Sequence, residues 1–343
     1  MNKKSLSANQ KIHNHLLKFL SYKKIFKIYL NFVKQVETNG KSDKIGVAVS
    51  GGPDSLALAF FTKCFSIKKN INCYFFLVDH GLRKESQKEA KYVASELKKF
   101  NIFIKLIKWK GKKPKSNIHH YARIHRYDLV LKNCKKMKIK KLLLGHHQDD
   151  LIENFFIRLF RGSGLKGLAS FGAESGLKEG NIKIIRPLIN HEKSDLEYVS
   201  KKVFKFFIND PSNTDEKFTR SRIRNFLKAE NFDLKKLKLT LKNLNKSDQA
   251  IEHYVKKNID ENCKYLIKKR KIILSENFFQ NSEEIVFRSL NYIFTKISKK
   301  NYPPRGRKML DLVLRINSKN FKKTTLGGCL IEKINKTIMI YKE

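Results

Sequence analysis

The chain has 343 residues, 41% of them hydrophobic, which is enough for two domains with a substantial apolar core. Its 74 Lys and Arg residues against 31 Asp and Glu give a formal net charge of +43. Such a charge indicates a polyanionic partner, most simply nucleic acid, although lysine is used heavily along the whole chain. No apolar run reaches the ~18 residues of a membrane span, so we expect a cytoplasmic protein.

The five cysteines are odd in number and include no Cys-x-x-Cys pair. This pattern argues against a disulfide framework, a structural zinc site and an iron–sulfur cluster, and it favours a reducing compartment.

Residues 1–40 are predicted to form a basic helical extension. Between Lys11 and Lys34, lysines alternate with Leu, Ile and Phe at roughly helical spacing. A membrane-surface helix and a transit peptide are alternatives. We favour a leading helix packed on the domain that follows.

The first buried strand, residues 45–49, runs directly into the sequence Ser-Gly-Gly-Pro-Asp-Ser at 50–55, and a helix is predicted to follow. Gly51 and Gly52 allow close backbone approach to a ligand, and the helix N-terminus favours a phosphate or pyrophosphate group. Asp54 suits such a site if Mg²⁺ bridges the carboxylate and the phosphates. The alternative is a plain turn with Asp54 as the helix N-cap. The loop is neither a Walker A motif nor Gly-x-Gly-x-x-Gly.

Strands and helices then alternate. Further strands are predicted at 72–78, 102–107, 141–145 and 182–185, and helices at 85–100, 116–138 and 151–161. This alternation predicts an α/β fold, a doubly wound parallel five-stranded sheet, over residues 41–232. In such sheets ligands bind at the carboxyl ends of the strands. Asp79, His80 and Gly145 follow strands and belong to that end.

The remaining residues, 233–343, are predicted to form a basic, mainly helical domain. Residues 325–331 and 336–341 read as a terminal β-hairpin around Asn335.

Two histidines and three acids are packed into residues 146–153, after the fourth strand. If a helix begins near His147, Asp149 and Asp150 both lie on the same face as Glu153. These carboxylates can ligate Mg²⁺, bind a cationic substrate or accept a proton. Attraction of acids to a helix N-terminus accounts for one or two of them, and the spacing disfavours zinc.

Arginine is scarce in this lysine-rich chain, so we expect it where a planar, bidentate group is needed for phosphates or carboxylates. The candidates for such contacts are Arg123, Arg126, Arg158, Arg161, Arg186, Arg220, Arg222 and Arg224.

The loop at 50–55 resembles the pyrophosphate-binding loop of the ATP pyrophosphatases, the PP-loop superfamily. Further motifs follow in the order of one family within it, at residues 78–83, 122–127, 145–154, 158–168, 186–188 and 210–213. The chain is therefore similar to the tRNA(Ile)-lysidine synthetases over about residues 40–230. The resemblance implies an ATP-dependent ligase that attaches free lysine to carbon 2 of the wobble cytidine of a tRNA(Ile) with a CAU anticodon. The reaction runs through an adenylated tRNA intermediate and releases AMP and diphosphate. The modified tRNA reads the codon AUA in place of AUG, and its amino-acid identity changes from Met to Ile. A homodimer is compatible with the sequence.

The resemblance also implies residue roles. ATP would be held by Ser50, Gly51, Gly52, Pro53, Asp54, Ser55, Asp79, His80 and Gly145. Asp54 would hold Mg²⁺, and Asp150 and Glu153 would bind lysine. His146 and one of Arg123 and Arg126 would act at the α-phosphate. The tRNA would contact Arg161, Arg220, Arg222 and Arg224.

Three other functions are weighed against this interpretation. A tRNA thiolase with the same loop generally needs paired cysteines, which are missing here. A glutamine-dependent ligase needs an amidotransferase domain or partner. A non-catalytic RNA- or nucleotide-binding protein would not need Asp54, Asp150 and Glu153 together.

Overall fold

The computed structural model describes residues 7–40, 42–81, 85–109, 118–169, 177–179, 181–209, 219–230, 232–266, 271–300, 303–318 and 320–343. They fall into two compact units, Met1–Leu241 and Lys242–Glu343. Among the described residues, no helix combines the length and apolar character needed to cross a membrane.

The first unit is built on a six-stranded sheet with the strand order β3-β2-β1-β4-β6-β5. Its strands are β1 (Lys44–Val49), β2 (Asn72–Asp79), β3 (Ile104–Lys108), β4 (Lys141–Leu143), β5 (Leu177–Glu179) and β6 (Ile182–Ile185). The five predicted strands, β1, β2, β3, β4 and β6, are all parallel to one another, as expected. β5, which was not predicted, pairs antiparallel with β6 at the edge.

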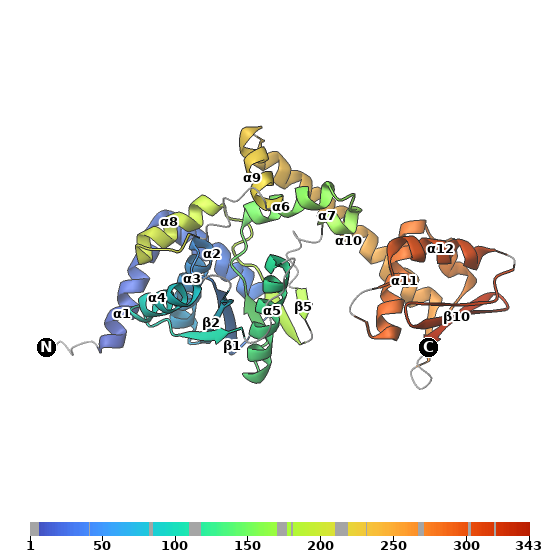
Figure 1. The fold of residues 1–343 in the computed structure, drawn as a ribbon, viewed down its shortest axis with the longest axis horizontal. Helices are drawn as coiled ribbons and strands as arrows, with labels where there is room; N and C mark the ends of the chain where they lie inside the picture. Colours follow the sequence, from blue (N-terminus) through green and yellow to red (C-terminus); the bar gives the residue numbers. More distant parts are fainter. Residues whose placement is uncertain are drawn as a thin grey trace. The chain divides into compact units, whose positions relative to one another are not determined.

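Helices cover both faces of this sheet (Figure 1). The helices of this unit are α1 (Ala8–Lys18), α2 (Lys23–Thr38), α3 (Pro53–Lys69), α4 (Ser86–Lys98), α5 (Ile118–Lys136), α6 (Gln148–Leu159), α7 (Leu165–Ala169), α8 (Lys193–Phe204) and α9 (Thr219–Ala229). Successive residues of β2 point to opposite faces. Phe75 and Leu77 join the core under α3, α4 and α8, whereas Phe76 and Val78 join the core under α5. The fold is therefore doubly wound, as predicted.

The N-terminal residues pack on this unit as helices. Ile25, Ile28, Phe32 and Val36 form one buried stripe of α2, and all four belong to the core that includes α3. This is the arrangement expected of a leading helix, with an apolar face against the domain.

The strand order places a switch point between β1 and β4. The chain leaves β1 toward β2 on one side of the sheet, and β4 lies on the other side. Connections diverge at such a point and leave a crevice at the carboxyl ends of the two strands. The loop at 50–55 and the acidic segment at 146–153 both begin there.

The second unit has an antiparallel sheet with the order β7-β8-β11-β10-β9. The division between units falls within α10 (Leu234–Asn262). The other elements are β7 (Cys263–Leu266), β8 (Lys271–Leu274), α11 (Glu283–Ser298), α12 (Gly306–Asn317), β9 (Lys323–Leu326), β10 (Cys329–Ile334) and β11 (Thr337–Lys342). The predicted hairpin is formed by β10 and β11, with Asn335 at its turn in the left-handed region, φ 55°. The sequence did not predict β7 and β8.

Candidate active site at the switch point of the sheet

The loop after β1 is held in shape by one hydroxyl group. Ser55 Oγ accepts hydrogen bonds from the amides of Ser50 at 3.0 Å and Gly51 at 3.1 Å, and donates to the Gly52 carbonyl at 2.9 Å. Two amides of the loop thus turn inward to Ser55. Ser50 is exposed at the loop surface, so its hydroxyl is the better placed of the two serines to reach a ligand. Ser55 shapes the loop, a role that sequence reasoning missed.

Gly51 and Gly52 have different reasons to be glycine. Gly51 has φ +90°, and a Cβ there would lie 2.8 Å from Val93 Cγ2. Its carbonyl also accepts a hydrogen bond from the Ile208 amide at 2.9 Å. Gly52 has an ordinary φ of −71°, and a Cβ would meet only Ser50 Oγ, at 3.7 Å. The fold therefore requires Gly51, whereas Gly52 leaves space beside the loop.

Gly145 lies where the segments after β1 and β4 meet. A Cβ at this position would lie 3.0 Å from the carbonyl oxygen of Asp54 and 3.2 Å from the amide nitrogen of Ser55. Both neighbours are backbone atoms, which cannot move aside as a flexible side chain can. Gly145 thus lets the β4 segment approach the first turn of α3.

A cavity of about 210 Å³ opens at this meeting point. Among the described residues, it is lined by Ala48, Val49, Ser50, Asp54, Ser55, Arg126, Tyr127, Val130, Leu142, Leu144, Gly145, His146, Asp150 and Arg220. The carboxyl ends of β1 and β4 thus bring together residues that the sequence assigned to ATP, to lysine and to the α-phosphate. Arg220, predicted as a tRNA contact, lies in the same cavity wall.

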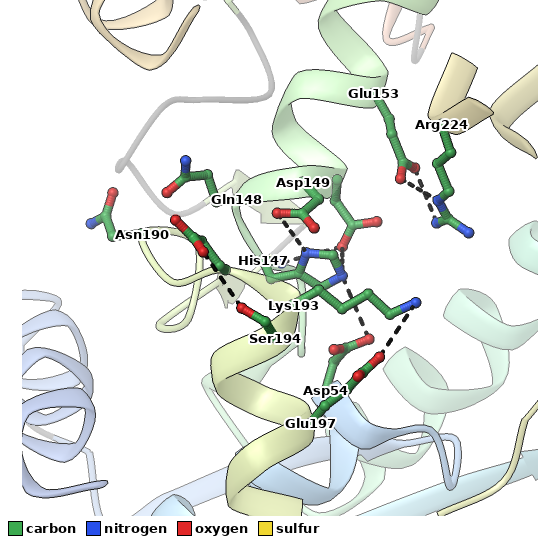
Figure 2. A network of polar contacts seen from close by, with 12 residues as sticks. Asp54, His147, Gln148, Asp149, Glu153, Asn190, Lys193, Ser194, Glu197 and Arg224 are labelled. Atoms are coloured by element: carbon green, nitrogen blue, oxygen red, sulfur yellow. Dashed lines mark hydrogen bonds and ion pairs between the residues drawn. The ribbon is translucent and has the colours of Figure 1, made fainter. Parts of the chain in front are cut away.

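A charged cluster from α3 and α6 lies beside the cavity (Figure 2). His147 is 3% exposed, and its Nε2 lies 3.6 Å from Asp54 Oδ2 and 3.5 Å from Asp150 Oδ2. The His147 amide donates to Asp150 Oδ2, which caps the start of α6. The sequence prediction chose His146 and passed over His147, although the two are adjacent in the motif.

Two buried atoms of this cluster, Asp54 Oδ1 and His147 Nδ1, have no hydrogen-bond partner among the described residues, and only the Asp54 atom is a carboxylate oxygen. Burial raises the pKa of Asp54 to about 6, with nearby Asp150 adding to the effect and His147 opposing it. Burial also raises the pKa of Asp150, but His147, His146 and Arg220 together bring it below its ordinary value. A buried carboxylate oxygen without a partner suits a cation.

Glu153 is already paired. Arg224 of α9 donates from Nε to Glu153 Oε1, and from Nη2 to Oε2 at 3.2 Å, a two-pronged pairing drawn in Figure 2. Glu153 is 1% exposed, and burial raises its pKa against the opposing effect of Arg224. The sequence assigned Arg224 to tRNA and Glu153 to lysine. It did not anticipate that the two side chains bind each other.

Histidine 146 is oriented by an arginine. Arg186 Nε donates to His146 Nδ1 at 3.1 Å, which leaves the other ring nitrogen of His146 to carry its proton. Arg186 had been predicted to contact a phosphate or carboxylate. Here it positions a histidine that lines the cavity.

The other predicted residues lie around this centre. Asp79 Oδ1 accepts from the Gly81 amide and the Ser86 hydroxyl, so it caps the turn into α4. Burial lowers the pKa of His80 to about 4, helped by Arg126, so this histidine is neutral near pH 7. Buried Pro53 begins α3, and its carbonyl accepts from Ser200 Oγ at 2.6 Å. The Arg123 side chain and residues 210–213 lie outside the described residues.

No group of three or more His, Cys, Asp or Glu side chains in the described part of the chain could hold a metal ion by itself. Mg²⁺ does not need such a group, because it binds through one or two carboxylates and substrate phosphates. Asp54, with its buried unpartnered oxygen, fits that kind of site.

Comparison with known proteins gives consistent results. A PP-loop domain family matches residues 23–231. The chain is 37% identical to the tRNA(Ile)-lysidine synthase of Wolbachia pipientis wMel, over 88% of this chain and 71% of that protein. It is 33% identical to the corresponding enzyme of Orientia tsutsugamushi (strain Boryong), over 92% of this chain and 74% of that protein.

The fold is also similar to that of a tRNA-modifying enzyme of known structure. The U34-tRNA thiolase NcsA from Methanococcus maripaludis aligns with a TM-score of 0.53, at 17% identity, over 67% of this chain and 79% of that one. At this identity the likeness concerns the fold alone.

Proposed function

The chain belongs to the tRNA(Ile)-lysidine synthase family, and from this premise we propose that it makes lysidine in tRNA(Ile) with a CAU anticodon. The observation that carries the proposal is the cavity at the switch point, where the 50–55 loop meets the carboxylates of α6. The proposal is supported by the lining of this cavity, where the 50–55 loop, which suits a phosphate group, and Asp150, which suits a cationic amine, occur together.

The reaction has two steps. The oxygen on carbon 2 of the wobble cytidine attacks the α-phosphate of ATP, and diphosphate leaves. The ε-amino group of free lysine then attacks carbon 2 and loses a proton, and AMP leaves with the oxygen. One site serves both steps, because the α-phosphate bonds to the oxygen on carbon 2 and the amine then attacks carbon 2 itself.

In the first step the chain binds and orients the nucleotide. Gly52 and the first turn of α3 lie against the phosphates, since the helix N-terminus attracts negative charge. Asp54 holds Mg²⁺, which neutralises the leaving diphosphate when bound. His146, held by Arg186, and Arg126 both line the cavity, and they would stabilise the charge that develops at the α-phosphate.

In the second step the carboxylates of α6 receive the lysine. Asp150 lines the cavity and is mainly ionised at neutral pH, because its pKa is lowered by the two histidines and Arg220. It therefore pairs with the ammonium group of lysine and orients the amine toward carbon 2. Glu153, proposed from the sequence as a second lysine ligand, is paired with Arg224, so Asp150 carries the main negative charge for the lysine.

The cysteines weigh against a thiolase. The five thiols stand at Cys64, Cys73, Cys134, Cys263 and Cys329, and all five are free. Burial raises the pKa of each, which makes them poor nucleophiles and poor cluster ligands near pH 7. Sulfur transfer that depends on paired reactive thiols lacks its chemistry here.

The test is incorporation of radiolabelled lysine into tRNA(Ile) bearing CAU, with Mg-ATP, and with tRNA(Met) of the same anticodon as control. We expect label in the first RNA only, with one AMP and one diphosphate released for each lysine. Diphosphate release that needs tRNA but gives no lysine incorporation would discard lysine as the nucleophile and retain the adenylation.

We propose that the enzyme acts in the cytoplasm and that it is a homodimer. Sedimentation of the purified protein tests the homodimer.

A further inference from the structure

Three phenylalanines form an exposed aromatic surface near the site, which we call the Phe platform: Phe160, Phe226 and Phe232. They are 66%, 40% and 36% exposed. The Phe226 ring centre lies 6.4 Å from that of Phe160 and 5.4 Å from that of Phe232. Buried Phe156 supports all three, with ring centres 5.9 to 6.2 Å away. Adjacent rings exposed on a protein surface mark an interaction site.

The Phe platform grows from the helices that build the cavity. Phe160 follows the end of α6, two turns or about 10 Å along the helix from Glu153. Phe226 lies on α9, which also carries Arg220 of the cavity wall and Arg224. Because α6 and α9 pack on each other (Figure 1), a ligand on the rings lies on the two helices that carry Asp150 and Arg220 of the cavity wall, about 15 Å along α6 from Asp150.

The surroundings of the Phe platform are positively charged. Arg161 is exposed next to Phe160, and Arg222 is exposed one helical turn before Phe226. Between residues 219 and 240 the chain has Arg220, Arg222, Arg224, Lys228, Lys235, Lys236 and Lys238, against Glu230 and Asp233. Asp233 is engaged in capping α10, where it accepts from the amides of Lys235 and Lys236. The partner of this surface is therefore an anion with flat apolar faces.

We propose that the Phe platform stacks unpaired bases of the tRNA anticodon loop, beside the wobble cytidine in the cavity. The assignment rests on the proposed function for the identity of the RNA. Unpaired bases offer their faces to aromatic side chains, whereas bases inside a duplex are already stacked. The flanking arginines bind the phosphates of the same loop, so recognition combines stacking with charge.

Substitutions that keep apolar bulk but remove the aromatic face test this assignment. In the full-length protein, Phe160→Leu is compared with Phe160→Trp. The control is Phe103→Leu, at a phenylalanine that is 65% exposed on another part of the unit. The probe is a synthetic anticodon stem-loop with CAU, carrying 2-aminopurine in the loop, whose fluorescence is quenched on stacking. We expect Phe160→Leu to weaken binding about 5- to 100-fold and to lose the quenching. Phe160→Trp and Phe103→Leu retain both, and affinity for ATP alone is unchanged in all three.

Wild-type affinity and quenching in Phe160→Leu would overturn the proposal. So would a loss that Phe160→Trp shares, because that outcome means a packing role. If Phe160→Leu abolishes self-association in sedimentation and leaves RNA binding intact, the surface joins two copies of the chain and the proposal is wrong. Lysidine formation by the wild-type enzyme is measured separately. If the wild-type enzyme forms no lysidine, the proposed function is rejected, and the stacking proposal is then judged from the fluorescence and affinity data alone.

Discussion

The two ends of the parallel sheet both have a cavity with charged walls, but the charges are arranged differently. The cavity at the amino end is the larger, about 360 Å³ against about 210 Å³. Its charges serve the fold. Lys141 Nζ donates to the carbonyls of Val36, at 3.1 Å, and Gly40, where α2 ends, and Lys69 pairs with Glu37 at 2.8 Å. At the carboxyl end, Asp54 keeps a buried oxygen without a partner among the described residues.

This difference identifies the functional end better than volume does. A buried polar atom left unpaired destabilises the fold, so it persists where a ligand completes it. The carboxyl end is also where the strand order reverses and the helix N-terminus faces the crevice. Loss of the buried Lys141 at the amino end should therefore change stability, whereas loss of the Asp54 carboxylate at the carboxyl end should chiefly change activity.

The largest effect is expected for Asp54→Asn. Loss of the carboxylate removes the proposed Mg²⁺ ligand, and we expect lysidine formation to fall at least about 10³-fold. The apo protein should become more stable at pH 7 by about 1–2 kcal/mol, because a buried charge is removed. Tritiated-lysine incorporation and thermal unfolding measure the two effects.

The matched control is Asp43→Asn, an exposed carboxylate that lines the amino-end cavity. It should leave both quantities near their wild-type values. If Asp54→Asn keeps wild-type activity, Asp54 does not hold the metal.

Arg224→Met is expected to cause the largest loss of stability. It leaves Glu153, which is 1% exposed, without its cation, and removing one member of a buried ion pair costs about 3–5 kcal/mol. The double variant Glu153→Gln/Arg224→Met should recover part of this loss, because no unpaired charge remains. Urea denaturation measures all three proteins.

Arg222→Met is the control on the same helix, since Arg222 is exposed. It should unfold like the wild type and bind tRNA more weakly. If Arg224→Met behaves in the same way, Arg224 is chiefly the tRNA contact that the sequence predicted.

Lys141→Ala tests the amino end. The substitution removes a buried four-carbon stem and two hydrogen bonds to the end of α2, so we expect a loss of about 1–3 kcal/mol in unfolding free energy. Because the site lies at the other end of the sheet, kcat and KM for ATP should not change in the fraction that is folded. A large change in KM with wild-type stability would mean that the amino-end cavity takes part in the reaction.

The sequence was sufficient for features encoded locally. The strand at 45–49 is an apolar run rich in β-branched residues and followed by the Gly51-Gly52 turn, and the loop and the acidic helix are continuous motifs, so each could be placed on its element. Pairing between distant segments could not be predicted. Glu153 and Arg224 are 71 residues apart, and only the packing of α6 on α9 brings them together. Nothing local distinguishes His147 from His146 either. The register of the turn after β4 decides which ring reaches Asp54.

The C-terminal unit shows the same limit. Cys263–Leu266 and Lys271–Leu274 are only four residues each and lie in a lysine-rich stretch that reads as helical. They become strands because β8 pairs with β11, which lies far along the chain from it. Tertiary pairing overrides the weak local preference of such segments.

The smallest expected effect is the dependence of activity and stability on pH, which the Asp54 carboxylate at the carboxyl end should cause and Asp43 at the amino end should not. The carboxylate of Asp54 is the form that binds a cation, and its pKa in the folded protein is about 6. At saturating ATP and limiting Mg²⁺, the adenylation rate should therefore fall as the pH drops through about 6.

The stability of the apo protein should change in the opposite direction. Since the pKa rises from 3.8 to about 6 on folding, the folded state binds the proton more tightly, and the unfolding free energy of the apo protein should decrease as pH rises through this window. The full shift corresponds to at most about 3 kcal/mol, and the side chain remains 25% exposed, so the observed change should be smaller. Asp54→Asn should abolish this part of the pH dependence of stability, and Asp43→Asn should retain it. If the wild type and Asp54→Asn show the same stability profile between pH 4 and 6, Asp54 titrates as an ordinary surface carboxylate, and the contrast between the two ends loses its electrostatic basis.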